Sequence, residues 1–302
     1  MHTQTITPDT LARSVIAVPP LARNPDLTLN RAANAAVITH LEAGGITNIL
    51  YGGNANFYHI APSEYAAALA MLAELASEDT WIIPSVGPTY GVMMDQAAIL
   101  REFDFPTAMV LPMTGLTTSD GVEEGFKRFA DAFGKPAVLY IKADNYITPE
   151  AAGRLVSGGH VSAIKYALVT EDPAVDPYLE QLLDHADAKY IVSGIGEQPA
   201  IVHLKQFGLT GFTSGCVCIA PKLSMDMLHA LNEDRIADAE TIRQTFKPLE
   251  DLRNDINPVR VLHQAVTLSG IADMGPAQPL LSLLADRDAQ NVAVAAQALK
   301  AR

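Results

Sequence analysis

The amino-acid sequence predicts a (β/α)8 TIM barrel with a C-terminal helical extension. Short apolar runs of strand type alternate with helical patterns over the first three quarters of the chain, the alternation is even, and the strand-like runs stop near residue 221. With 302 residues, of which 49% are hydrophobic, the chain can bury one large core. An open, doubly wound sheet is the alternative, and the evenness of the repeat favours the barrel.

The expected elements follow one another in a regular order. The strands are expected at Ser14–Val18, Asn48–Tyr51, Trp81–Val86, Thr107–Leu111, Ala137–Ile141, Val161–Tyr166, Lys189–Ser193 and Gly211–Ser214. The helices between them are expected near Thr28–Ala43, Ser63–Ser77, Gly91–Glu102, Asp120–Phe133, Thr148–Val156, Pro177–Ala186 and Ala200–Phe207. Two of these helices begin with N-terminal signals, since Ser63 precedes Glu64 and Thr148 precedes Pro149.

Only helical patterns remain after residue 221. Helices are expected at Lys222–Asn232, Arg235–Asn254, Pro258–Ser269 and Ala289–Ala301, and Pro276 and Pro279 break the run before the last of them. We therefore expect a barrel over residues 1–221 and a helical extension over residues 222–302. The extension is expected to pack on the barrel and not to form an independent module.

Composition narrows the class of protein. The net charge is −13 and no basic tract is present, so a nucleic-acid partner is not expected. The apolar runs are too short to span a bilayer and the first residues are polar, so neither a membrane partner nor a signal peptide is expected. Cys216 and Cys218 are expected to be reduced, packed thiols, which is typical of a cytoplasmic protein. The histidines are scattered, so no metal site is expected.

Lys165 carries the strongest chemical signal. It ends the apolar run Val161–Lys165, which is expected to be buried, whereas most other lysines lie in polar or helical stretches. Burial lowers the pKa of an ammonium group, and the resulting neutral amine can attack a carbonyl to form a Schiff base. The ordinary alternative is a lysine at a strand end whose ammonium reaches solvent. Lys142 competes for the same role, but it lies in a polar stretch.

Other polar groups are expected beside Lys165, because the carboxyl ends of barrel strands form one rim. Tyr140 ends the preceding strand and could transfer protons there. The pair Gly52-Gly53 follows another strand, and its backbone could approach a ligand and direct amides at a carboxylate. An ordinary tight turn is the alternative for these glycines. Ser193-Gly194 and Thr213-Ser214 would reach the same rim.

Tyr140 and the Ile164-Lys165 pair, each closing a strand, resemble the N-acetylneuraminate lyase/dihydrodipicolinate synthase superfamily, a group of Schiff-base (β/α)8 enzymes. The resemblance covers nearly the whole chain, and its further motifs occur in the expected order: Val15–Pro19, the glycine loop, Gly208–Ser214 and Asn257-Pro258-Val259. It implies a homo-oligomer, either a tetramer or a dimer. It also implies an enzyme without a cofactor, since the protonated imine serves as the electron sink.

Three positions depart from the dihydrodipicolinate synthases of that superfamily. Gly53 stands where those enzymes carry a proton-relaying threonine, and Thr114 matches a second relay tyrosine. Asn145 matches the arginine that binds the carboxylate of the aldehyde substrate. With these differences, a role in lysine biosynthesis is not expected.

Other stretches are similar to 5-dehydro-4-deoxyglucarate dehydratases. Gly52-Gly53 followed by Phe57 matches their loop, although Asn56 replaces the glutamate usual in that group. Phe212–Lys222 and Asp251–Asn254 are also similar to that group. The exact substrate therefore stays open.

The resemblance implies a mechanism in which Lys165 forms an iminium with a 2-oxo acid and Tyr140 shuttles protons. The expected substrate-binding residues are Gly53, Asn54, Asn56, Asn145, Gly194, Thr213 and Ser214. The sequence therefore predicts a cofactor-free lyase, a dehydratase or an aldolase, that acts on a 2-keto-3-deoxy sugar acid or a similar 2-oxo acid. Two alternatives stay open: a pyruvate-dependent aldolase or synthase, and a non-catalytic sugar-acid sensor on the same scaffold.

Overall fold

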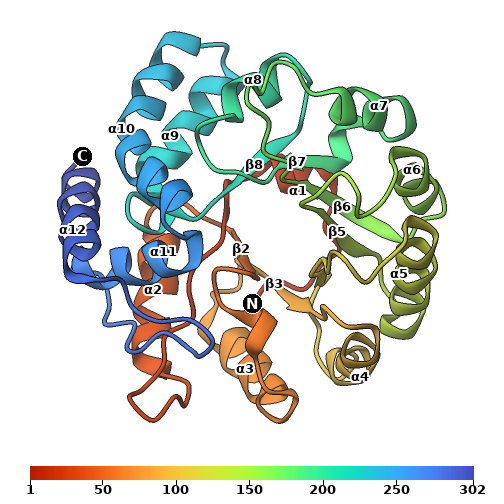
Figure 1. The fold of residues 1–302 in the computed structure, drawn as a ribbon, viewed down its shortest axis with the longest axis horizontal. Coiled ribbons are helices and arrows are strands. Elements are labelled where there is room, and N and C mark those ends of the chain that lie inside the picture. Colours follow the sequence, from red (N-terminus) through yellow and green to blue (C-terminus); the bar gives the residue numbers. More distant parts are fainter.

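The structure, a computed structural model, describes residues 1–302 and contains a closed barrel of eight parallel strands. Each strand pairs with the next in the sequence, and β8 pairs with β1 to close the ring (Figure 1). The strands are β1 (Ile16–Ala17), β2 (Asn48–Tyr51), β3 (Trp81–Val86), β4 (Met109–Val110), β5 (Ala137–Ile141), β6 (Val161–Tyr166), β7 (Ile191–Ser193) and β8 (Gly211–Ser214). The expected (β/α)8 barrel is confirmed.

Helices connect the strands and surround the barrel. They are α2 (Arg31–Ala43), α3 (Pro62–Leu75), α4 (Tyr90–Leu100), α5 (Ser119–Phe133), α6 (Pro149–Ser157), α7 (Pro177–His185) and α8 (Ala200–Lys205). Thr148 caps α6 as expected, with its side chain accepting from the Ala151 amide. The expected cap at Ser63 is wrong, because α3 begins at Pro62, whose fixed φ suits the first helical position.

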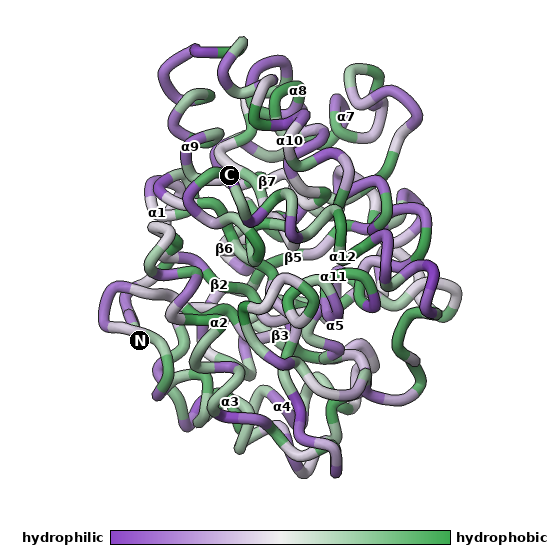
Figure 2. Tube along the Cα trace, turned by 90° about the vertical axis from the view of Figure 1, so that its left-hand side faces the viewer, coloured by the Kyte–Doolittle hydropathy of each residue, from purple (hydrophilic) through white to green (hydrophobic).

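The strands are buried on both faces. Every residue of β2, β3, β5 and β6 is buried, because side chains fill the barrel on one side and the helices cover the other. Hydrophobic residues accordingly gather along the strands, whereas hydrophilic residues lie mostly on the outer segments (Figure 2). Cys216 and Cys218 lie in a 3-10 helix, η3 (Cys216–Cys218), as buried thiols that form no disulfide.

A short helix that the sequence did not indicate, α1 (Pro8–Arg13), lies beside the starts of β2 and β8, at the amino end of the barrel. Thr7 caps it in a reciprocal capping box with Thr10. The Asn48 side chain, at the start of β2, donates to the Thr10 carbonyl at 2.9 Å. The opposite end of the barrel, where the strands finish, is left for a site.

Four helices follow the last strand: α9 (Pro221–Asn232), α10 (Ile236–Asp255), α11 (Pro258–Leu268) and α12 (Asp286–Lys300). α9 contacts α8 and α2 as well as α10, and α12 packs on α10 and α11 (Figure 1). The boundary at residue 221 between barrel and extension stays a prediction. None of the helices combines the length and the apolar character that crossing a membrane requires.

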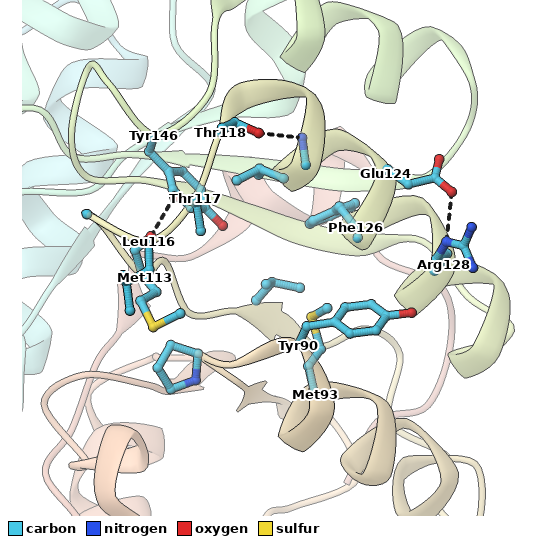
Figure 3. Close-up of a pocket in the computed structure, with 16 residues that line it drawn as sticks. Tyr90, Met93, Met113, Leu116, Thr117, Thr118, Glu124, Phe126, Arg128 and Tyr146 are labelled. Atoms are coloured by element: carbon cyan, nitrogen blue, oxygen red, sulfur yellow. Dashed lines mark hydrogen bonds and ion pairs between the residues drawn. The ribbon is translucent and has the colours of Figure 1, made fainter.

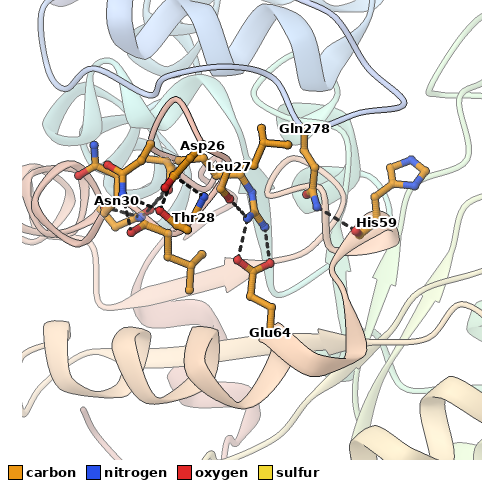
Figure 4. Close-up of polar contacts among 12 residues, drawn as sticks. Asp26, Leu27, Thr28, Asn30, His59, Glu64 and Gln278 are labelled. Carbon is orange, nitrogen blue, oxygen red and sulfur yellow. Dashed lines mark hydrogen bonds and ion pairs between the residues drawn. The ribbon is translucent and has the colours of Figure 1, made fainter.

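The segment between α11 and α12, residues 269–285, fastens the C-terminal helices to the early part of the chain. The Arg23 amide donates to the Met274 carbonyl at 3.0 Å. The Gln278 side chain donates to the His59 carbonyl at 2.9 Å (Figure 4), and the Asn56 side chain donates to the Gln278 carbonyl at 3.3 Å. Residues far apart in the sequence therefore hold the loop after β2 in place.

A partly buried ion pair supports the same junction. The Arg23 guanidinium binds both carboxylate oxygens of Glu64, at 2.8 and 2.9 Å, and donates to the Leu27 carbonyl at 2.6 Å (Figure 4). Arg23 is buried, with 3% of its surface exposed, so this two-point contact is the counterion that makes its burial tolerable.

At Gly275 the segment approaches the backbone of Arg23 so closely that a side chain there should lower the stability of the protein. A Cβ at Gly275 would lie 1.9 Å from the Arg23 carbonyl oxygen. Gly270 has the same positive φ of +70°, but a Cβ there would meet nothing within 4 Å, so it is a matched control for backbone strain alone. We expect Gly275→Ala to lower the free energy of unfolding by about 1–3 kcal/mol more than Gly270→Ala does.

Urea unfolding followed by far-ultraviolet circular dichroism measures this difference. Equal unfolding midpoints for the two variants would show that the segment does not press against Arg23.

Candidate active site

A cavity of about 360 Å³ opens at the carboxyl end of the barrel. Its walls come from the ends of the strands and from the last turn of α10, and its lining includes Val18, Gly53, Asn54, Tyr58, Tyr140, Lys142, Lys165, Gly194, Thr213 and Arg253. The volume lies in the ordinary range for small-molecule sites, roughly 300–1,000 Å³. Six of the nine expected site residues therefore border one cavity: Gly53, Asn54, Tyr140, Lys165, Gly194 and Thr213.

Lys165 and Tyr140 are neighbours in the cavity wall. They are directly paired across β6 and β5, and both are buried. The Lys165 Nζ lies 3.8 Å from the centroid of the Tyr140 ring. At this separation the ring shields the amine from water on one side, while the cavity remains open to a substrate on another.

The surroundings of Lys165 favour its neutral form. Burial, and to a smaller extent the positive charge of Arg253, lowers its pKa from 10.5 to about 7. Burial raises the pKa of Tyr140, so this hydroxyl keeps its proton near neutral pH. The pair thus combines an amine that is partly neutral at pH 7 with a phenol that can donate a proton.

The loop after β2 reaches the cavity through its backbone. Gly53 and Asn54 line the cavity, while the Asn54 side chain donates to the Val18 carbonyl at 2.9 Å. That hydrogen bond ties the loop to the end of β1, and the Asn54 amide group therefore serves first to hold the loop. The backbone at Gly53 and Asn54 remains the part of the loop that can meet a ligand.

Ser214 does not line the cavity, unlike Thr213 beside it. Alternate residues of a strand point to opposite faces, so Thr213 faces the cavity and Ser214 points the other way. The buried Ser214 hydroxyl donates to the Glu197 carboxylate at 2.8 Å and accepts from the Val217 amide at 3.0 Å. In this position Ser214 fixes the ends of β7 and β8, and its expected contact with a substrate stays a prediction.

Asn56 and Asn145 also lie outside the lining of this cavity, and their expected contacts with a substrate stay predictions. Asn56 has a left-handed backbone, with φ +60°, which turns its side chain toward Gln278 and a separate small cavity lined by Arg260 and His263. Asn145 is exposed in the turn between β5 and α6 and is not among the residues that line the cavity. Hydrogen-bonding capacity alone did not show which way these side chains point.

Tyr58, Lys142 and Arg253 are among the cavity residues that had no place in the expected site. Tyr58 reaches in from the loop after β2, with its hydroxyl donating to the Pro112 carbonyl at 3.4 Å. Lys142, which the sequence raised only as a competing nucleophile, is exposed at the cavity mouth. Arg253 comes from α10, outside the alternating strands and helices in which the site was sought.

A larger cavity, of about 790 Å³, lies elsewhere, between α4, α5 and the loop that precedes α5 (Figure 3). Its charged groups are Glu124 and Arg128, which pair at 2.7 Å on the surface. Leu116 on its rim is 82% exposed. Size alone would favour this cavity, but the reactive amine lies in the smaller one, so we place the candidate active site there. Nowhere in the chain do three or more His, Cys, Asp or Glu side chains gather to hold a metal ion.

A closed barrel with a lined cavity at the carboxyl ends of its strands defines the class of (β/α)8-barrel enzymes. The chain belongs to the dihydrodipicolinate synthetase family, whose family model matches residues 12–299. Members of this superfamily are lyases and aldolases, so the chain is an enzyme of that broad type. No curated protein sequence matches the chain.

Solved structures share the fold over nearly the whole chain. Dihydrodipicolinate synthase from Bacillus clausii has a TM-score of 0.85 and 20% identity, covering 95% of this chain and 97% of that one. A prophage protein of the same family from E. coli K12, solved with pyruvate, has a TM-score of 0.83 and 18% identity, covering 95% and 98%. Sialic acid aldolase from Ruminococcus gnavus has a TM-score of 0.83 and 14% identity, covering 95% and 97%. At these identities the likeness establishes the fold.

Proposed function

We propose that the protein is a cofactor-free lyase that forms a Schiff base between Lys165 and a 2-oxo acid. The observation that carries the proposal is the buried Lys165 amine, with its pKa lowered to about 7, in the wall of the cavity. A lysine held in this state is a nucleophile toward ketones near neutral pH. The structure solved with pyruvate is a relative with the same fold.

The chemistry begins with attack of the neutral Lys165 amine on the C2 ketone of the substrate. The carbinolamine loses water, and the resulting iminium draws electrons from the bond that breaks next. In a dehydratase, C3 loses a proton and the enamine expels the C4 hydroxyl as water. In an aldolase, the C4 hydroxyl loses a proton, the C3–C4 bond breaks, and the enamine forms directly. Tyr140, beside Lys165, is proposed to carry these protons.

The C1 carboxylate is proposed to bind at the loop after β2. Gly53 and Asn54 border the cavity there, and backbone amides of a glycine turn suit an anion. Thr213 offers a hydroxyl from β8, and Gly194 lies at the end of β7. The preferred substrate class is a 2-keto-3-deoxy sugar acid, as in the dehydratase-like members that the sequence resembles. Assembly into a homo-oligomer stays a prediction.

Reductive trapping tests the proposal. The protein is incubated with a panel of 2-oxo acids and sodium cyanoborohydride, and the adduct is located by peptide mass spectrometry. We expect an adduct on Lys165 with pyruvate and with at least one larger 2-oxo acid. If none of the acids gave an adduct, the non-catalytic sensor would become the better interpretation.

The pKa of Lys165 sets the pH dependence of adduct formation. Because this pKa is lowered to about 7, the neutral amine becomes more abundant as the pH rises through 7. We expect the rate of trapping with pyruvate to increase about tenfold per pH unit well below 7 and to level off above about 8. A rate that kept rising tenfold per unit between pH 8 and 10 would mean that the reactive lysine has an ordinary pKa.

A further inference from the structure

The turn after β7, residues 194–198, lies directly against Lys165. The Gly194 amide donates to the Tyr166 carbonyl at 2.6 Å. A Cβ at Gly194 would lie 3.1 Å from Lys165 Cγ and 2.7 Å from the Tyr166 carbonyl oxygen, so the backbone of the turn touches the side chain that is proposed to react. The path of this turn therefore sets where the Lys165 amine can lie in the cavity.

Glu197 fastens the turn to three other elements. Its carboxylate accepts from the Ser214 hydroxyl, at the end of β8, at 2.8 Å and from the Ser224 hydroxyl, on α9, at 2.7 Å. Its backbone amide donates to Glu250 Oε1, on α10, at 3.0 Å. Both glutamates are fully buried, so the turn is held by polar side chains that lie inside the protein.

Glu250 lies close against the backbone of the turn. Gly196 has a φ of +102°, and a Cβ there would lie 1.9 Å from Glu250 Oε1. Glu250 Oε2 is buried and has no hydrogen-bond partner. Two ionised carboxyls at Glu197 and Glu250 would repel each other strongly, because the protein interior screens charge poorly. The geometry therefore requires one of the two to carry a proton.

The surroundings assign this proton to Glu250. Burial raises the pKa of both carboxyls. For Glu197 the hydrogen bonds from Ser224 and Ser214 oppose the rise in pKa, whereas for Glu250 the charge of Glu197 adds to it. Near neutral pH the pair is therefore one carboxylate, at Glu197, and one carboxylic acid, at Glu250.

The other charged and titratable groups around the pair do not replace this proton. Arg253, three residues further along α10, lowers the pKa of Glu250, but less than burial and the neighbouring carboxylate raise it. Arg243, on the same helix, is already paired with an acidic side chain of that helix at 2.7 Å. The thiols of Cys216 and Cys218 in η3 lie within the field of the pair, and burial raises the pKa of both, so they stay neutral.

We infer that Glu197 and Glu250 are positioning residues for Lys165: as one carboxylate and one carboxylic acid, they hold the turn after β7 against its side chain. The inference rests on the proposed function, because it gives the pair a part in the reactivity of the Lys165 amine. When Glu250 loses its proton, two buried anions face each other and α10 must withdraw from the turn. The Glu197 amide then loses its acceptor, Gly194 no longer presses on Lys165, and the amine leaves the geometry in which it attacks a ketone.

The variant Glu250→Gln tests this inference, because its amide keeps an oxygen in place of Oε1 and cannot ionise. For the wild-type protein and the variant we would measure the maximal rate of trapping with pyruvate, and the pyruvate concentration that gives half of it, over a range of pH. The two rates should agree at neutral pH. Beyond the plateau the wild-type rate should fall by up to about tenfold per pH unit relative to the variant. The half-maximal concentration should change little, and the ratio of rates cancels the effect of pH on the reagent and on Lys165 itself.

Two further variants complete the comparison. Glu250→Ala removes the acceptor of the Glu197 amide and should lower the maximal rate at neutral pH by roughly 10- to 100-fold, the loss expected from a misplaced reacting group, while Glu250→Gln restores it. Asp251→Asn is the matched control. Asp251 accepts from Gln198 of the same turn at 3.0 Å, but its side chain is 44% exposed, so this variant should keep the wild-type pH dependence.

Each of three results would overturn the inference. The first is a ratio of Glu250→Gln to wild-type rates that stays at one up to about pH 10.5, where an exposed carboxyl is long ionised. The second is loss of the circular dichroism of the wild-type protein over the pH range in which its rate falls, since the pair would then serve the fold alone. The third is a wild-type rate for Glu250→Ala.

A second reagent separates this inference from the Schiff-base proposal. Carbamylation of Lys165 by cyanate, followed by peptide mass spectrometry, repeats the comparison of variants without a 2-oxo acid. The same dependence on pH and on Glu250 should appear. If no 2-oxo acid gave an adduct while carbamylation followed this pattern, the Schiff-base proposal alone would fail and the role of the pair would stand.

Discussion

Replacement of Lys165 by alanine should abolish both turnover and the reductive mass addition with every 2-oxo acid. The amine is the group proposed to form the covalent bond, and no other buried lysine lies in the cavity. Lys165→Arg should be equally inactive, because a guanidinium stays charged and is not a nucleophile. Intact-protein mass spectrometry after trapping measures the mass addition for both variants.

The control for this experiment is the second lysine of the cavity. Lys142 is exposed, whereas Lys165 is buried. Lys142→Ala should therefore still be trapped with pyruvate. If peptide mapping instead placed the adduct on Lys142, the assignment of the nucleophile to the end of β6 would be wrong.

Tyr140→Phe should slow turnover by roughly 10²–10⁴-fold, the usual range for loss of a general acid–base group. The substitution separates the two features of this residue. Phenylalanine keeps the ring whose centroid lies 3.8 Å from the Lys165 Nζ, and it removes only the hydroxyl. The fold and the burial of the lysine should therefore survive, and the loss should lie in proton transfer.

Single-turnover kinetics with a substrate found by trapping would measure this loss. Circular dichroism would show that the variant is folded. A Tyr140→Phe variant that formed the adduct and turned over at the wild-type rate would remove Tyr140 from the mechanism and leave proton transfer to water or to the substrate.

The strand ends could be predicted from the sequence because they combine two strong local signals. An apolar run long enough for one strand marks the element, and a polar residue at its end marks the rim, as at Tyr140 and Lys165. The five strands Asn48–Tyr51, Trp81–Val86, Ala137–Ile141, Val161–Tyr166 and Gly211–Ser214 have the expected bounds. α1 was missed because six residues of mixed polarity carry too little periodicity for recognition.

The remaining site residues depend on information that is not local. Thr213 and Ser214 are adjacent and chemically alike. Successive residues of a strand point to opposite faces, and the sequence does not show which of the two faces the cavity. Asn56 follows a glycine pair that suggested a ligand, but its left-handed backbone turns it toward Gln278. Arg253 stood in a stretch similar to dehydratases, yet only tertiary packing of α10 brings it to the rim.

The hydrogen bonds that join the loop after β2 to residues 269–285 have a consequence for biosynthesis. A ribosome delivers the barrel strands first, and Lys165 is present long before Gln278 emerges. Until that late segment docks, the loop after β2 lacks two hydrogen bonds, the one from the Asn56 side chain to the Gln278 carbonyl and the one from the Gln278 side chain to the His59 carbonyl. Arg253, on α10, is also synthesised late. The nascent chain thus carries its nucleophile before it can position a substrate. Competence to bind should arrive only near the end of synthesis, in one late folding step.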